Sequence, residues 1–341
     1  MCQCAAGPCR KRIAARRLNV GDRNAVDEFE IIRRYFERET AADVRVGVGD
    51  DGAVLIPSPD RDLITVVDTL VAGIHFPETL AAADIGYRSV AVNLSDVAAM
   101  GARPRWMTLA LTLAEPDSSW LEDFSRGLFE AADPHELALV GGDTTRGSDT
   151  VVSIQIIADV ATGRAMTRDG AEPGDSIFVT GTVGDAAAGL SILQGGLARS
   201  DDVDFLIRRF ARPDARVAAG AAIAAVAHAA IDLSDGLFAD LGKLLAASEV
   251  SGTLELADIP LSSPMSSLMA ENDAIRFALG GGDDYELCFA ARIADADIGA
   301  IAERAGVSIT RIGRVDEGDG LRCTRNGDDY PYRDDGYRHF H

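Results

Sequence analysis

The chain has 341 residues, 47% of them hydrophobic, and a formal net charge of −21. This length and apolar content allow two α/β domains, while the acidic balance argues against nucleic acid as a partner. No run of about 18 uncharged apolar residues occurs, and the basic N-terminus lacks the apolar stretch of a secretory signal. We therefore expect a cytoplasmic protein without membrane contact.

The N-terminal segment holds Cys2, Cys4 and Cys9, with no histidine nearby and no second cysteine pair at zinc-ligand spacing. We expect residues 1–24 to form a disordered leader. Cys288 and Cys323 stand in apolar, strand-like stretches, where we expect reduced thiols.

Residues 25–160 alternate between helical and strand patterns, as expected for a first α/β domain. The patterns predict, in chain order, a helix at Asp27–Arg38, a strand at Leu63–Val67 that ends at Asp68, a helix at Ala82–Met100 closed by Gly101, a strand at Trp106–Leu113, a helix at Ser118–Ala132 and a strand at Val151–Val160.

Residues 161–341 restart the pattern and predict a second α/β domain. The expected elements are a strand at Ile177–Thr180, a glycine turn at Gly181–Gly184, a helix from Asp185, further helices to about His228, a strand at Ile231–Ser234 that leads into a helix, a strand at Tyr285–Ala291, a helix at Ala294–Ala305 and a strand at Ile309–Val315. The fold class predicted is therefore α/β (α+β), in two domains.

Acidic residues gather in five short clusters beside glycines or at element ends. They are Gly49-Asp50-Asp51-Gly52, Asp68-Thr69, Ser95-Asp96, Gly141-Gly142-Asp143-Thr144-Thr145 and Asp232-Leu233-Ser234-Asp235-Gly236. Each cluster alone is typical of a turn or a helix cap. Together they indicate a site of several carboxylates, which suits Mg²⁺ ions that complete their coordination with substrate phosphate oxygens.

A phosphate-binding lysine loop is absent, because neither Lys11 nor Lys243 follows a glycine-rich motif. Charge on a triphosphate must then be neutralised by metals, arginines such as Arg146 or Arg168, and backbone N–H groups. Gly141 and Gly142 offer a backbone that a triphosphate could approach closely.

Motifs along most of the chain resemble those of one family, the thiamine-monophosphate kinases. They are Asp27-Glu28-Phe29, Gly47-Val48-Gly49-Asp50-Asp51, residues 68–76 and 91–102, Gly141 to Gly147, Thr180-Gly181-Thr182 with Gly184-Asp185, Ile231 to Gly236, residues 284–289, and Gly336 to Phe340. The resemblance implies the fold of the aminoimidazole-ribonucleotide-synthetase-like superfamily, a homodimer formed through the first domain, and direct transfer of a phosphoryl group from ATP to thiamine monophosphate.

The same resemblance implies roles for individual residues. The expected Mg²⁺ ligands are Asp51, Val67 through its carbonyl, Asp68, Asp96, Asp143, Asp232 and Asp235, of which Asp96, Asp143 and Asp232 are central to catalysis; ATP contacts fall on Gly142, Asp143, Arg168 and Ser234, and substrate contacts on His75, Asp283 and Tyr337.

The sequence departs from the family pattern at two places. Val66-Val67 stand where Ser-Thr is common, which removes a hydroxyl ligand, and Asp283 stands where glutamate is usual, which shortens a substrate contact. On general grounds His75 could instead be a packed histidine, and Tyr337 an anchor for the C-terminal segment.

Sister activities and one other class remain as alternatives. The superfamily also includes purine-pathway cyclo-ligases, selenophosphate synthetases and hydrogenase-maturation proteins. Selenophosphate synthetases need a reactive cysteine or selenocysteine beside lysine. Hydrogenase-maturation proteins end in cysteine, whereas this chain ends Phe340-His341. A non-catalytic, acidic Ca²⁺-binding scaffold would also explain the carboxylates, and nucleotide binding would distinguish it from the kinase.

Overall fold

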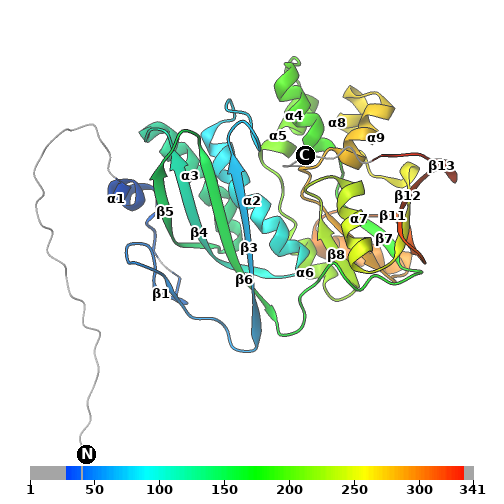
Figure 1. Ribbon diagram of the computed structural model, residues 1–341, viewed down its shortest axis with the longest axis horizontal. Helices are drawn as coiled ribbons and strands as arrows, with labels where there is room; N and C mark the ends of the chain where they lie inside the picture. Colours follow the sequence, from blue (N-terminus) through cyan, green and yellow to red (C-terminus); the bar gives the residue numbers. More distant parts are fainter. Residues whose placement is uncertain (1–27, 40, 334–341) are drawn as a thin grey trace, which may run out of the picture.

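The structure, a computed structural model, describes residues 28–39 and 41–333 of the chain. Two sheets form the framework, and helix α2 lies on the first sheet and reaches toward the second (Figure 1). The expected leader at 1–24 and Tyr337 lie outside the described residues.

The N-terminal half forms a four-stranded sheet. Its elements are α1 (Glu28–Ile31), the π-helical turn η1 (Ile32–Phe36), β1 (Val44–Val46), β2 (Val54–Leu55), β3 (Arg61–Val71), α2 (Ala82–Ala99), β4 (Arg103–Leu113), α3 (Ser118–Ala132), the 3-10 turn η2 (Asp133–His135), β5 (Ala138–Arg146) and β6 (Val151–Ala161). The strand order of the four-stranded sheet is β3-β6-β4-β5, antiparallel except for the parallel pair β4–β5, and the short strands β1 and β2 pair separately with each other. Strands β3 and β5 are therefore the two edges.

Two predictions for this half are corrected, and one strand was not predicted. The helix expected at Asp27–Arg38 is only one α-turn followed by a π-helical turn that buries Tyr35 and Phe36. The strand expected to end at Asp68 continues to Val71, because β3 pairs with β6 along its whole length. Strand β5 was not expected, since its glycines and Asp143 are typical of a turn.

Helices α2 and α3 cover one face of this sheet and approach each other closely at two glycines. A Cβ on Gly86 of α2 would lie 2.1 Å from the carbonyl oxygen of Phe124, and a Cβ on Gly127 of α3 would lie 1.8 Å from that of Ala83. Neither distance is possible for a real side chain, so both glycines are needed for the contact. The pairing fixes α2 against the sheet.

The C-terminal half forms a seven-stranded sheet. Its elements are β7 (Ser176–Thr180), α4 (Asp185–Gly195), α5 (Asp201–Ala211), α6 (Val217–Ile223), β8 (Ala229–Asp232), α7 (Leu237–Ala247), β9 (Ser251–Glu255), η3 (Leu256–Asp258), α8 (Ser263–Leu268), α9 (Glu271–Gly280), β10 (Leu287–Ala291), α10 (Asp295–Ala305), β11 (Ile309–Asp316), β12 (Gly320–Arg325) and β13 (Asp328–Tyr330). The strand order is β13-β12-β9-β11-β7-β10-β8, with β12–β9 the parallel pair.

Each face of the second sheet has its own core. Apolar residues of α7 and α9 pack on one face, and those of α6 and α10 pack on the other, around the stacked rings of Phe178 and Phe289. Cys288 in β10 and Cys323 in β12 are buried free thiols, as expected from their apolar surroundings. Among the described helices, none is long and apolar enough to cross a bilayer.

Candidate active site

Three carboxylates come together where the two halves meet: Asp68 of β3, Asp96 of α2 and Asp232 of β8. The backbone N–H of Asp68 donates to Asn93 Oδ1 at 3.0 Å, which ties β3 to α2. The hydroxyl of Ser95 donates to Asp232 Oδ2 at 2.8 Å, which ties α2 to β8. Helix α2 thus links an acidic strand from each sheet.

The environment of these carboxyls opposes their ionisation. Burial raises the pKa of Asp68. Burial, followed by the charge of Asp68, raises the pKa of Asp96 to about 6, with Arg168 acting in the opposite direction. Burial, followed by the charge of Asp96, raises the pKa of Asp232 to about 8. Such a group binds a hard cation readily, because the cation removes the repulsion.

The loop after β8 is held by the side chain of Asp240. Its Oδ2 accepts the backbone N–H groups of Ser234 and Asp235 at 2.9 Å and 2.8 Å. Lys243, also on α7, bridges Asp240 and Oδ2 of Asp235. In this arrangement one oxygen of Asp235 is paired with an ammonium group, so only Oδ1 is free of that ion pair.

A cleft of about 490 Å³ opens beside this loop. Its lining includes the predicted residues Val67, Asp68, His75, Ser234, Asp235 and Asp283, together with Arg88 and Tyr285. The Nδ1 atom of His75 accepts the backbone N–H of Val71 at 3.0 Å, so a neutral ring carries its proton on Nε2. The cleft brings together the described residues expected to contact substrate.

A second cavity, of about 480 Å³, contains Asp96, Arg168 and Asp232. Its walls are completed by apolar residues of β3, α2, β8 and α7, among them Val66 and Ile231, and by the polar Thr167 and Asp169 of the loop after β6. Asp68 lines the first cavity and its charge acts on Asp96 and Asp232 of the second, and the consecutive residues Val67 and Val66 line one cavity each, so the carboxylate cluster lies between the two cavities. An anionic chain could span both.

A third cavity, of about 340 Å³, holds the remaining predicted residues, Asp51, Gly142 and Asp143, beside β5. From the sequence we expected Gly141 and Gly142 to let a triphosphate approach the backbone, and the structure gives a further reason for the glycine at position 142. A Cβ there would lie 1.8 Å from the carbonyl oxygen of Leu109 in β4, whereas a Cβ at Gly141 would meet nothing within 4 Å. Both glycines line the cavity, but only at Gly142 would a side chain collide with the neighbouring strand.

The third cavity lies far from the carboxylate cluster in the same chain. Strand register aligns Thr69 of β3 with Ser153 of β6, Ala110 of β4 and Asp143 of β5. Three strand spacings separate Asp143 from β3, about 14 Å along the sheet. Figure 1 shows β5 at the edge of the sheet remote from the C-terminal half.

Two cleft residues were missed by the sequence analysis: Arg88 and Tyr285. Arg88 is a buried arginine in the middle of an apolar helix, and Tyr285 stands in the left-handed region with φ of 52°. A charge within an otherwise apolar helical pattern was the signal for Arg88. Nothing in the sequence revealed the backbone conformation of Tyr285.

The donor chemistry of the site fits Mg²⁺, although a complete shell is not preassembled. Within residues 28–39 and 41–333, no three His, Cys, Asp or Glu side chains are gathered closely enough to hold a metal ion as they stand. Mg²⁺ commonly takes one or two carboxylates and completes its shell with water and phosphate oxygens. The roles of the individual residues as ligands therefore stay predictions.

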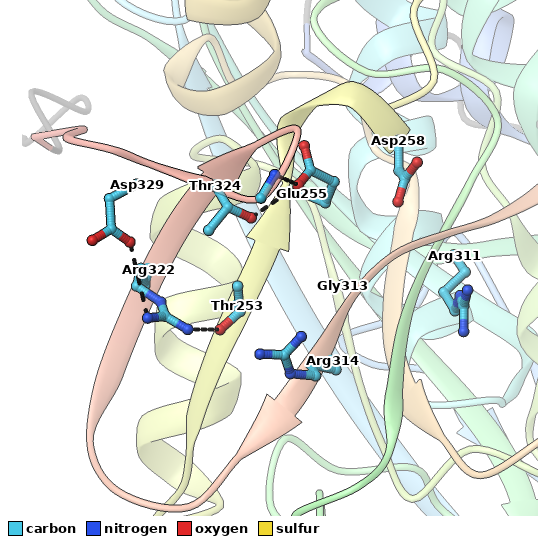
Figure 2. A pocket seen from close by; sticks show the side chains of 10 residues that line it. Thr253, Glu255, Asp258, Arg311, Gly313, Arg314, Arg322, Thr324 and Asp329 are labelled. Carbon is cyan, nitrogen blue, oxygen red and sulfur yellow. Dashed lines mark hydrogen bonds and ion pairs between the residues drawn. The ribbon is translucent and has the colours of Figure 1, made fainter.

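Another cavity, of about 400 Å³, lies on the C-terminal sheet and contains none of the predicted site residues (Figure 2). Some of its polar groups bond one another: Arg322 donates to Thr253 Oγ1 at 3.2 Å, and Thr324 donates to Glu255 at 3.1 Å. We regard this cavity as part of the sheet's own structure.

Comparisons with known proteins first define the class. Residues 49–164 match the family model described as AIR synthase related protein, N-terminal domain, and residues 172–326 match AIR synthase related protein, C-terminal domain. The two-domain fold predicted from the sequence is thereby confirmed. Hydrogenase maturation protein HypE, at 20% identity and a TM-score of 0.67 over 82% of this chain and 87% of its own, shares the fold.

Closer relatives define the family. The thiamine-monophosphate kinase of Escherichia coli (strain K12) is 45% identical over 93% of this chain and 99% of its own length. The crystal structure of thiamine-monophosphate kinase from Stenotrophomonas maltophilia K279a is 44% identical, with a TM-score of 0.79 over 89% of this chain and 96% of that one. AaThiL complexed with AMPPCP and TMP is 31% identical, with a TM-score of 0.73 over 84% and 89%. The chain belongs to the thiamine-monophosphate kinase family.

Proposed function

We propose that this protein transfers the γ-phosphoryl group of ATP to thiamine monophosphate and so makes thiamine diphosphate. One observation carries the proposal: the half-buried Asp68 and Asp96 and the buried Asp232 influence one another's charge and line two cavities that are large enough for two anionic substrates. A related protein, AaThiL, is known in complex with AMPPCP, an ATP analogue, and TMP.

The chemistry requires little proton transfer. The acceptor is a phosphate oxygen that is already ionised near neutral pH, so a general base is not needed. Bound Mg²⁺ supplies positive charge between the two phosphate groups. The residues that would hold it are Asp51, Asp68, Asp96, Asp143, Asp232, Asp235 and the carbonyl of Val67.

The protein's own part is alignment and electrostatics. Arg168 lines the second cavity together with Asp96, which supports a role for its guanidinium in binding phosphate oxygens of ATP. The backbone of Ser234 is held by Asp240 and the ring of His75 by the backbone N–H of Val71, which supports roles for both as preorganised contacts to the substrates. Asp283 faces the cleft where thiamine monophosphate would bind.

The active site is completed by a second copy of the chain. Asp143 and Asp51 are grouped by the family resemblance with Asp68 and Asp96, yet about 14 Å of sheet separates Asp143 from β3 within one chain. Mg²⁺–oxygen contacts are about 2.1 Å, so these residues cannot share an ion within one chain. A homodimer that sets β5 of one copy beside β3 of the other brings them together.

The N-terminal sheet offers a surface for that dimer. Its face opposite α2 and α3 carries Leu63 and Val67 of β3, exposed by 54% and 63%. The side chain of Asp143 points to the same face. Thr145 follows two residues later in β5 and therefore shares this face, where its hydroxyl forms a hydrogen bond with that of Thr112 in β4. Long edge strands with exposed apolar residues are typical of surfaces that pair with another chain.

An assay tests the reaction directly. Purified protein is incubated with Mg²⁺ and ATP and either thiamine monophosphate or thiamine, and thiamine diphosphate is measured by its oxidised fluorescent derivative. We expect product from the monophosphate alone. Binding of ATP without product from either acceptor would refute the assignment and favour a sister activity.

A further inference from the structure

Arg88 is a charged side chain at the back of the substrate cleft, and it has no role in the function described so far. Its side chain is only 1% exposed. The guanidinium donates through Nη1 to the carbonyl oxygen of Phe210 at 2.6 Å and lies over the Phe210 ring, 4.4 Å from its centroid. Its Nε is buried without a hydrogen-bond partner among the described residues. A charge held this firmly needs an anionic partner.

That partner is Asp283, in the same cleft. Arg88 Nη2 and Asp283 Oδ1 form an ion pair, and the hydroxyl of Tyr285 donates to the same Oδ1 at 3.1 Å. Both bonds go to one oxygen, and no described residue is bonded to Oδ2. Asp283 is 28% exposed on the cleft side. The second oxygen is therefore free to accept a bond from a ligand.

The backbone around Asp283 alternates between cleft and core. Asp283 and Tyr285, at φ of 64° and 52°, face the cleft, whereas Asp284 accepts the N–H groups of Gly184 and Ala186 at the start of α4. Glu286, fully buried, is bonded by Arg209, Arg216 and Thr180. These core contacts hold the left-handed backbone that turns Asp283 toward Arg88.

We propose that Arg88 is a positioning residue that holds Oδ1 of Asp283 so that Oδ2 binds the thiamine part of the acceptor. The inference rests on the proposed function, in which Asp283 contacts substrate. The thiamine part carries an amino group on its pyrimidine ring and a cationic thiazolium ring, and both attract a carboxylate. Because Asp283 is shorter than the glutamate usual in the family, the arginine fixes where this shorter group points.

Kinetics on Arg88→Met and Arg88→Lys test this role. We expect Arg88→Met to raise the KM for thiamine monophosphate about ten- to a hundredfold, the range for loss of a charge-assisted bond, while the KM for ATP stays within about twofold. Arg88→Lys, which keeps the charge, should recover part of the loss. The Ki of free thiamine as a competitor should rise as much as the KM, since thiamine lacks the phosphate.

A paired variant separates positioning from folding. Asp283→Asn leaves the Arg88 charge buried and unpaired and should lower Tm, whereas Arg88→Met with Asp283→Asn should restore Tm but keep the high KM. Adding Arg88→Met to Asp283→Asn should raise the KM little further. As a matched control, Arg105→Met removes a largely buried arginine that pairs with Asp159 and Asp43 outside the cleft. It should lower Tm and leave the KM unchanged.

The outcomes distinguish the two proposals. A wild-type enzyme without kinase activity would remove the proposed function itself. An active wild type whose Arg88→Met variant keeps its KM for thiamine monophosphate would overturn the role of Arg88 alone. A raised KM with an unchanged Ki for thiamine would also overturn it, because Arg88 would then bind the phosphate instead.

Discussion

Mixing two inactive variants provides a sharp test of the shared active site. Asp143→Asn and Asp96→Asn each remove one carboxylate, and each homodimer should be inactive because both of its sites lack a ligand. In a mixed dimer with two-fold symmetry, one site has both defects and the other has none. Activity should then return on mixing.

The expected recovery follows from the strand order. Asp143 lies three strands from Thr69, about 14 Å along the sheet, so it serves the site of the partner copy. Random exchange of equal amounts gives about half mixed dimers, each with one intact site of two, so activity should reach about one quarter of wild type. Subunit exchange is verified by native mass spectrometry on chains with different tags.

A control mixes wild type with the Asp96→Asn, Asp143→Asn double variant. Each site of that mixed dimer carries one defect, so activity should fall to about a quarter of wild type rather than to about half. If verified mixed dimers of the two single variants have no activity, both carboxylates act within one chain and the dimer argument is refuted.

Three further results are expected. First, Mg²⁺ should raise Tm more at pH 8 than at pH 6. The pKa of Asp232 is about 8 in the metal-free fold against 3.8 in the unfolded chain, so its ionisation opposes folding as pH rises toward 8, and below that pH the metal must displace protons in order to bind. Thermal shifts that are equal at both pH values would contradict this. Second, Gly220→Ala should cost about 1–3 kcal/mol of unfolding free energy by denaturant titration, because its Cβ would lie 2.1 Å from the carbonyl oxygen of Ala98 in α2; an unchanged midpoint would show that α6 moves freely. Third, Cys288 and Cys323 should react with a disulfide reagent only when the protein unfolds, because both are buried. Burial also raises the pKa of each thiol, that of Cys323 to about 11. Rapid reaction of either thiol in the native protein would argue against its burial.

Elements with strong periodicity were predictable, and α3 at Ser118–Ala132 has the predicted bounds. Its apolar stripe is regular, and Asp117 caps its first turn through the backbone N–H groups of Ser119 and Trp120. Strand β5 was not predictable because Gly141, Gly142 and Asp143 are poor strand residues. There the backbone of β4 decides the conformation, and this information lies far away in the sequence.

The candidate site, too, was predictable from the sequence only in part. The motifs grouped Asp68, Asp96 and Asp232, and the structure brings these three side chains near one another because each stands at a regular element that the pattern reveals; their roles stay predictions. The separation of Asp143 from them depends on strand order, which no local pattern encodes. Arg88 was missed because its function depends on the side chain it meets, and Asp283 is distant from it in the chain.

Helix α2 is held by close backbone contacts at three places: Gly86, Gly127 of α3, and Gly220 of α6. Backbone approaches of this kind leave no room for gradual adjustment, so the helix cannot shift to suit a larger or smaller acceptor. A related enzyme with another acceptor would have to change the loop around His75 or the segment around Asp283 instead. The three close contacts thereby hold Arg88 and Asp96, which lie on the same helix, at fixed positions relative to the helices packed around it.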